Sequence, residues 1–149
     1  MKQLLLAFAL FLTTTVSLAQ TPTQKVFGAV VKNNPADVET LLTAGADANA
    51  PVEMVPGFPT TFLIIAAGNG HLEVVKALIK HKAQVDKADS FNATALMAAA
   101  ANGSLDVVEF LLANGANPKA KDKDGKDVLA NAKDGGNADV VKLIQAKAK

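Results

Sequence analysis

Two histidines are the first side chains in this sequence that could carry chemistry. His71 and His81 are the only histidines among 149 residues, and they stand ten positions apart with no third ligand nearby. Because a zinc ion in a protein takes at least three side-chain ligands, this pair alone does not predict a metal site. A metal-assisted hydrolase that uses His71 or His81 therefore stays the weakest functional hypothesis.

The acidic segment 122–127 and the serines are the other candidates for chemistry. The segment reads Asp-Lys-Asp-Gly-Lys-Asp, but it lacks the acidic or amide fifth residue and the distal glutamate of a calcium loop. We expect it to be a surface hairpin. Ser90 and Ser104 are the only serines after residue 19, and the chain has no cysteine. No nucleophile with a base and an orienting group can be assembled, so the sequence predicts neither an enzyme nor a metal or cofactor.

The composition is that of one folded domain without a strong charge. Half of the residues are hydrophobic, 19% are charged, and the formal net charge is +1. Every basic side chain apart from the two histidines is a lysine, so the chain has no guanidinium group to grip phosphates. These features argue against a nucleic-acid partner.

The first nineteen residues have the pattern of a secretory signal peptide. Lys2 precedes the apolar run 4–12, and the small residues Ser17 and Ala19 follow it. We expect cleavage after Ala19, because the run is too short to span a bilayer and the order of segments is that of a signal peptide. The remaining chain would have 14 lysines against 14 acidic residues, no membrane anchor and a periplasmic location. Nucleotide cofactors are scarce there, which further argues against a cofactor-dependent enzyme.

Residues 20–149 contain an internal repeat that recurs about every 33 residues, a period typical of stacked helical repeats. Nine positions define it: Thr61, Leu63, Ala66, Ala67, Gly70, Val74, Val75, Leu78 and Ile79. All nine recur in type one period later, from Thr94 to Leu112, and most recur again from Asp127 to Gln145. An earlier copy, residues 26–46, is offset by an insertion of four residues. The sequence therefore predicts a repeat protein.

The repeat resembles the ankyrin repeat. The resemblance is carried by GNGHLEVVKALIKHKAQVD at 68–86, ANGSLDVVEFLLANGANP at 101–118, NNPADVETLLTAGADANA at 33–50 and GGNADVVKLI at 135–144. It implies an all-α solenoid of about four helix–loop–helix repeats with β-hairpin fingers, the first of them enlarged. The repeats would span about 24–50, 56–88, 89–121 and 122–149, all in one domain over 20–149. In this frame His71 opens a second helix and has a structural role.

The same frame predicts the helix ends and the capping repeat. Glycines Gly45 and Gly115 are placed to end the second helices, whereas Lys82 takes that position in the repeat between them. We expect strain at Lys82, because that position favours a left-handed backbone. Lys133 and Gln145 replace apolar residues in the last copy, as suits a terminal repeat that faces water.

The residues that the repeat does not require are the candidate binding site. In the ankyrin family the hairpin tips and the exposed side of the first helices form a concave surface that binds proteins. Phe58 and Phe91 occupy equivalent positions of successive repeats, so we expect their rings to lie side by side as a binding pair. The full predicted set is Met54, Val55, Phe58, Asn69, Ser90, Phe91, Asn102, Lys123 and Lys126.

The enlarged first finger, residues 51–60, leaves two interpretations open. It contains three prolines and a glycine together with the apolar residues Val52, Met54, Val55 and Phe58. An apolar tip often marks an interaction site. Alternatively, the loop could fold back and cover the first helix pair. The third finger is mostly charged, which is typical of a solvated surface.

The sequence therefore favours an exported, non-enzymatic protein-binding module, either a monomer or a heterodimer with its partner. The specific hypothesis is an inhibitor or immunity protein that restrains a periplasmic enzyme such as a peptidoglycan hydrolase. It depends on the expected compartment and on the family resemblance. The alternative is a scaffold or stabilising accessory protein for an exported enzyme, for example in stress defence.

Overall fold

The structure is a computed structural model that describes residues 19–149. Residues 1–18, and with them the apolar run and Ser17 of the expected signal peptide, lie outside the described part. None of the helices described over 19–149 combines the length and the apolar character that a membrane crossing requires.

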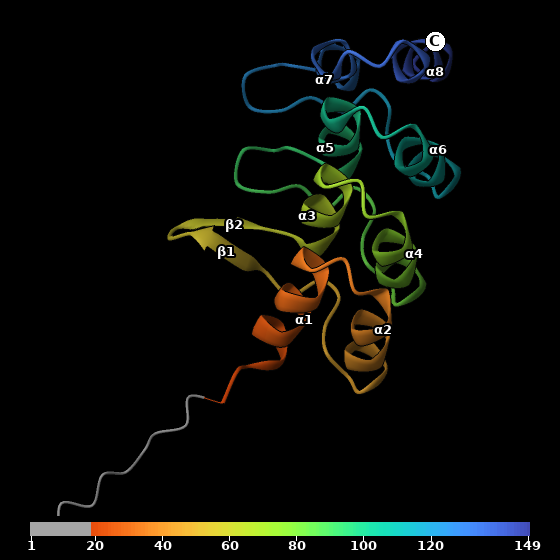
Figure 1. Cartoon of the computed structure of the whole chain (residues 1–149). Helices are drawn as coiled ribbons and strands as arrows, with labels where there is room; N and C mark the ends of the chain where they lie inside the picture. Colours follow the sequence, from red (N-terminus) through yellow and green to blue (C-terminus); the bar gives the residue numbers. More distant parts are fainter. Residues whose placement is uncertain (1–18) are drawn as a thin grey trace, which may run out of the picture.

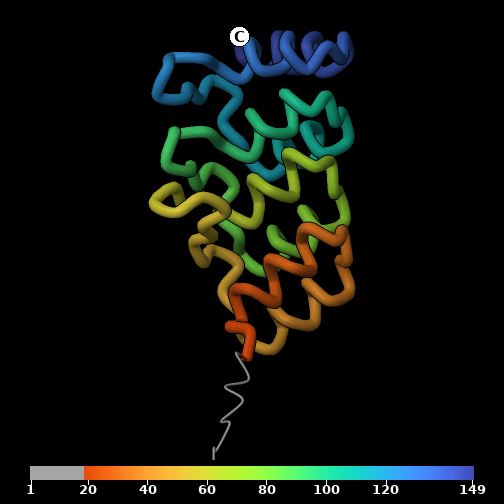
Figure 2. Tube along the Cα trace, turned by 60° about the vertical axis from the view of Figure 1, so that its left-hand side comes forward, coloured from red at the N-terminus to blue at the C-terminus, as the bar shows by residue number. Residues whose placement is uncertain are grey.

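The described residues form a stack of helix pairs with one two-stranded sheet. The elements are α1 (Pro22–Val31), α2 (Pro35–Thr43), β1 (Val52–Val55), β2 (Phe58–Thr60), α3 (Phe62–Gly68), α4 (Leu72–Lys80), α5 (Ala95–Asn102), α6 (Leu105–Ala113), α7 (Val128–Gly135) and α8 (Ala138–Lys147). Figure 1 shows the odd-numbered helices in one column and the even-numbered helices in a second column beside it. Figure 2 shows the first and last helix pairs at opposite ends of the stack. The expected all-α solenoid of four helix pairs is confirmed.

The first helix of each later pair begins at the same place in the repeat because an oxygen side chain caps it. Thr61 Oγ1 accepts a hydrogen bond from the Ile64 N–H at 3.1 Å, and Asp127 Oδ1 accepts one from the Ala130 N–H at 2.8 Å. Thr94 makes the equivalent contact between them. Such caps satisfy backbone donors that a helix start would leave free. They also fix where each finger ends and each helix begins.

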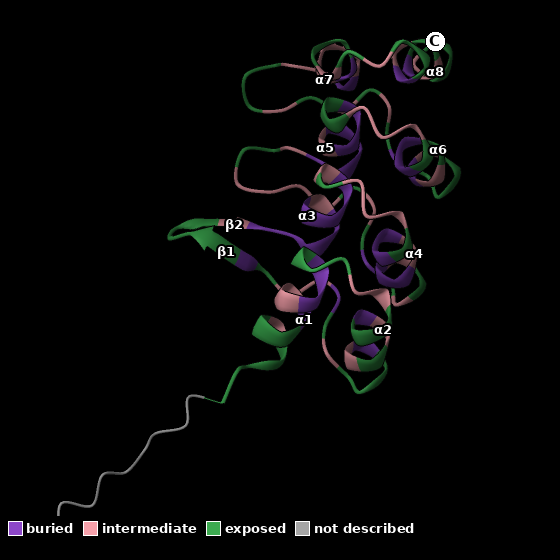
Figure 3. Cartoon of the chain, viewed as in Figure 1, coloured by how far each residue is buried: buried purple, intermediate pink, exposed green. Residues whose placement is uncertain are grey.

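The core lies between the two columns of helices, where Figure 3 shows the buried residues. The second helices contribute branched side chains such as Val74, Leu78 and Leu111, which are fully buried. The first helices contribute alanines, which let neighbouring repeats approach closely. At Gly135 a Cβ atom would lie 2.3 Å from the Ala100 carbonyl oxygen, so α5 and α7 can approach this closely only because that residue is glycine.

The fingers extend to one side of the stack, to the left in Figure 1. In the first finger, β1 and β2 pair antiparallel, with Val52 opposite Thr60 and Val55 opposite Phe58. The second and third fingers are tight turns, joined at Asp89–Ala93 and Asp122–Lys126 by equivalent backbone hydrogen bonds. Within residues 19–149, the enlarged first finger alone is long enough for a regular strand pair, because the other two turns leave too few residues for a strand ladder.

The end of the stack that follows the third finger is polar, as the sequence predicted. Lys133 on α7 and Gln145 on α8 are both exposed, and they stand where inner repeats have buried or half-buried apolar residues. A solenoid needs such a terminal unit because its last face has no neighbour to cover it.

Replacing Leu111 with alanine should destabilise the fold strongly. Leu111 is fully buried on α6, and a cavity left by a core leucine costs about 2–5 kcal/mol of unfolding free energy. Urea denaturation followed by circular dichroism measures the loss. Leu112→Ala is the matched control, because the neighbouring Leu112 is only half-buried. Equal losses in the two variants would contradict the assigned helix face.

Replacing Lys82 with glycine should stabilise the protein. Lys82 has a φ of 70°, in the left-handed region, where the equivalent Gly115 has 89°. Relief of that conformation is worth up to about 1 kcal/mol after the entropy cost of glycine. The reciprocal change, Gly115→Lys, should lower stability by a similar amount. Thermal denaturation of both variants tests this, and a lower midpoint for Lys82→Gly would refute the assignment of strain.

Candidate functional site

Both histidines join the first helix pair to the second. His71 is the N-cap residue of α4, and its Nδ1 lies 3.1 Å from the Val30 carbonyl oxygen of α1. His81 is the C-cap residue of α4, and its Nε2 lies 3.1 Å from Glu39 Oε1 of α2. The structural role expected for His71 is confirmed. Within residues 19–149, no group of three His, Asp or Glu side chains is placed to hold a metal ion.

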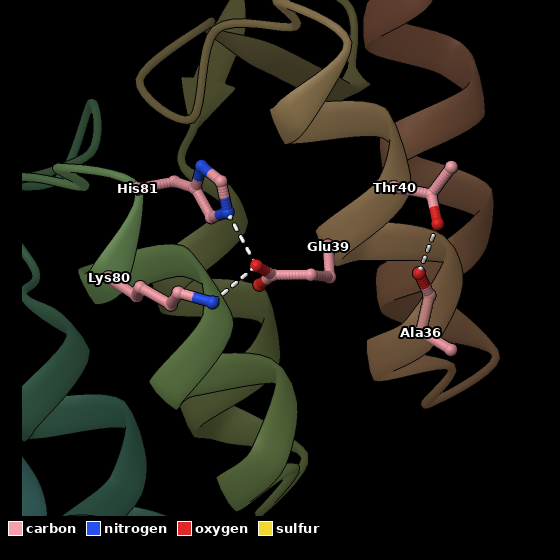
Figure 4. Close-up of polar contacts among 5 residues, drawn as sticks. All are labelled: Ala36, Glu39, Thr40, Lys80 and His81. Carbon is pink, nitrogen blue, oxygen red and sulfur yellow. Dashed lines mark hydrogen bonds and ion pairs between the residues drawn. The ribbon is translucent and has the colours of Figure 1, made fainter.

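Glu39 is the centre of the polar contact between α2 and α4 (Figure 4). Its Oε1 atom lies 2.5 Å from Lys80 Nζ as well as close to the His81 ring. The Lys80 ammonium, and after it the His81 side chain, lower the pKa of the Glu39 carboxyl below its usual value of 4.5. All three groups are partly exposed, so this contact belongs to the packing of two repeats.

Asp122 closes the third finger in the way that Asp89 closes the second. Asp122 Oδ1 accepts hydrogen bonds from the backbone N–H groups of Asp124 and Lys126, at 3.0 and 2.9 Å. Asp89 Oδ1 accepts the equivalent bonds from Phe91 and Ala93, at 2.8 and 2.9 Å. Segment 122–127 is thus a turn of the repeat, as the sequence predicted.

Phe58 and Phe91 form a stacked pair across the first two fingers. Their ring centroids are 5.3 Å apart and their planes differ by 3°. The side-by-side arrangement expected from their spacing is therefore confirmed. Phe58 is 48% exposed and Phe91 is 55% exposed. Because about half of each ring is exposed, the two phenylalanines add little to the hydrophobic core. They are therefore the strongest candidates for contact with another molecule.

The first finger presents two further apolar side chains because β1 contains a bulge. The register shifts between Glu53 and Val55, so β1 carries one residue more than β2 at this point, and such a bulge redirects side chains. Met54 and Val55 are 60% and 56% exposed. Val52, which the sequence grouped with the apolar residues of the finger tip, is instead buried at the base of the finger. The finger projects outward, as Figure 3 shows for its exposed strands.

A groove of about 500 Å³ lies between the fingers and the first helices. Met54, Val55, Phe58, Thr60, Ile64, Ile65, Gly68, Asn69, Asp89, Phe91 and Ala98 line it. Five of the nine predicted site residues therefore meet in one place: Met54, Val55, Phe58, Asn69 and Phe91. We call these eleven residues the finger groove. Its volume is within the range of about 300–1,000 Å³ found for ligand sites.

Sequence reasoning did not include Asp89 or Ile64 in the site. Neither residue is one of the nine positions that define the repeat. The period of the repeat placed both residues correctly, but it gave no indication that they line a groove. The exposed side of α3 is set by packing against α5, which becomes visible only in the folded stack.

Four predicted site residues lie outside the finger groove. The Ser90 hydroxyl donates to the Pro59 carbonyl oxygen at 2.9 Å, and the Asn102 amide donates to Ser104 Oγ at 2.6 Å. Lys126 pairs with Asp134 at 2.5 Å. These three side chains serve the fold, which the sequence pattern did not reveal. Lys123 is exposed on the third finger, and its backbone N–H donates to the Phe91 carbonyl oxygen at 3.0 Å.

Replacing Glu39 with glutamine should make the protein less stable at neutral pH. A carboxyl whose pKa is lower in the folded state stabilises the fold above its unfolded pKa of about 4.5 and ceases to do so as the pH falls through the folded pKa. The stability difference between parent and variant should therefore shrink as the pH falls from 7 to 3. Urea denaturation at several pH values measures it. A difference that stays constant would rule out the ion-pair contribution.

Comparison with known proteins agrees with this architecture. A family model described as ankyrin repeats in three copies matches residues 26–122, which is more than half of the chain. No curated protein gives a match. The matched range includes most of α1 and all of α2 to α6, together with the first two fingers. The resemblance read from the repeated residues is thus confirmed independently, and the chain belongs to the ankyrin-repeat family.

Proposed function

We propose that this chain is an exported, non-enzymatic module that binds another protein through the finger groove. Ankyrin repeats form a protein–protein interaction module. The observation that carries the proposal is the exposed stack of Phe58 and Phe91 at the groove. Buried aromatic anchors supply much of the energy of protein interfaces, and these two rings are already held in place before any partner binds.

The finer proposal names the partner as a periplasmic enzyme and the effect as inhibition. The first nineteen residues favour export, because they combine a basic start, a short apolar run and a small-residue cleavage site. A rigid surface that covers an enzyme commonly blocks access to its active site. We propose a peptidoglycan hydrolase as the enzyme class, with self-protection of the cell wall as the purpose. The alternative is that the chain is a scaffold that stabilises an exported enzyme, and the effect of the chain on its partner's activity distinguishes the two.

Replacing Phe58 and Phe91 together with alanine should abolish most partner binding and leave the fold intact. Loss of two interface anchors costs about 2 kcal/mol or more, which is roughly thirtyfold in affinity. The test is a pull-down from periplasmic extract with residues 20–149 as bait, followed by titration of the captured enzyme. Val31→Ala is the matched control, because it removes a 50% exposed apolar side chain from α1.

Two results would count against this surface. One is retention of the same partner by the parent and by the double variant. The other is a large fall in the thermal midpoint of the double variant, which would show that the rings serve the fold. Once a partner enzyme has been captured, its activity is measured with and without this chain, and the sign of the change decides between inhibition and stabilisation. A fall supports inhibition, whereas unchanged activity with greater thermal stability would replace inhibition by the scaffold role.

A further inference from the structure

The finger groove has charges of one sign only. The two segments that build it, residues 51–69 and 88–101, contain Glu53 and Asp89 as their only charged residues. The other lining residues are apolar or uncharged, and only Asp89 among them is titratable. The lysines of the neighbouring third finger are absent from the lining. A ligand in this groove therefore meets mostly apolar walls, the uncharged polar residues Thr60 and Asn69, and Asp89 as the one acidic residue.

The Asp89 carboxylate is positioned by hydrogen bonds to only one of its two oxygens. Its Oδ1 accepts the two backbone hydrogen bonds of the second finger. Within residues 19–149, no hydrogen bond or ion pair is formed to Oδ2. The turn therefore fixes the position of the carboxylate without neutralising its charge. Glu53, in contrast, turns back to its own finger, where its Oε2 accepts from the Gly57 N–H at 3.3 Å.

We infer that the finger groove selects a partner segment in which an apolar side chain stands next to a lysine or arginine. The apolar side chain packs against the Phe58–Phe91 stack, Met54 and Ile64. The cationic group reaches Asp89 and forms a charge-assisted hydrogen bond with its open oxygen. This inference rests on the proposed protein-binding function and adds the chemistry of the segment that is recognised.

The negative charge of Asp89 is the reason why we expect a basic residue in the bound segment. An apolar segment alone would leave the Asp89 charge partly covered and unpaired, which costs free energy. An acidic segment would be repelled, since no cationic side chain lines the groove to offset the carboxylate. A basic side chain satisfies the carboxylate while its neighbour fills the apolar walls. Asp89 therefore acts as the specificity-determining residue of the site.

The repeat supplies a matched control for Asp89. Asp122 occupies the equivalent position of the next repeat and closes the third finger with the same pair of hydrogen bonds, but it does not line the groove. In Asp89→Asn and Asp122→Asn, the amide oxygen can still accept both backbone hydrogen bonds. Each variant therefore removes one negative charge from the same kind of turn. Only Asp89→Asn removes it from the groove.

A phage-displayed library of random short peptides provides the probe. It is selected on residues 20–149, and clones that also bind the Phe58/Phe91 double-alanine variant are discarded. The remaining clones should be enriched in an apolar residue next to a lysine or arginine. A synthetic peptide of the most enriched sequence is then titrated by fluorescence anisotropy. Its affinity should fall about fivefold or more on Asp89→Asn and stay nearly unchanged on Asp122→Asn.

A second peptide completes the comparison, with its basic residue replaced by norleucine. The norleucine peptide should bind the parent protein with the same reduced affinity that the basic peptide has for Asp89→Asn. Its own affinity should not fall further on Asp89→Asn. The inference fails if groove-dependent clones show no enrichment of basic residues, if no clone depends on the groove, or if the two aspartate variants behave alike. If partner capture is still lost in the double-alanine variant, such a failure leaves the proposed function standing.

Discussion

The fold and the finger groove both require the first helices of neighbouring repeats to stack closely. Each helix pair has an apolar face that it cannot bury alone, so neighbouring pairs must cover one another. Buried alanines on α3 and α5, and Gly135 where α7 meets Ala100, allow the backbones to approach. The spacing between repeats is then fixed by backbone contact. A larger side chain at these positions would push whole repeats apart.

This spacing also sets the distance between the fingers. Each finger leads into a capped first helix, so two stacked helices place their fingers next to one another. Phe58 and Phe91 are consequently brought to a centroid distance of 5.3 Å without any strand pairing between the two fingers. Two hydrogen bonds from Ser90, through its backbone N–H and its hydroxyl, to the Pro59 carbonyl oxygen tie the fingers together. The binding surface is thus preorganised by the same packing that builds the core, which reduces the entropy cost of binding.

The 33-residue period of the sequence predicted the structural features that recur in each repeat. It could not predict the hydrogen-bond partners of individual polar side chains. The helix pairs, the capping repeat, the left-handed Lys82 and the stacked phenylalanines all follow from positions that lie one period apart. The burial of Val52 and the bulge in β1 belong to the insertion, which has no equivalent in the other repeats. Asn102 was among the predicted binding residues because the repeat does not require it. Its amide instead holds the turn between α5 and α6.

Hydrogen-exchange mass spectrometry of the complex tests whether the finger groove is the binding surface. The chain is compared with and without its captured partner, and the amides of the fingers are compared with those of the even-numbered helices. We expect new protection in residues 52–60 and 89–93, together with the start of α3, while α2, α4, α6 and α8 stay unchanged. Protection confined to the even-numbered helices, or to the third finger, would contradict this expectation and would place the binding surface elsewhere on the stack.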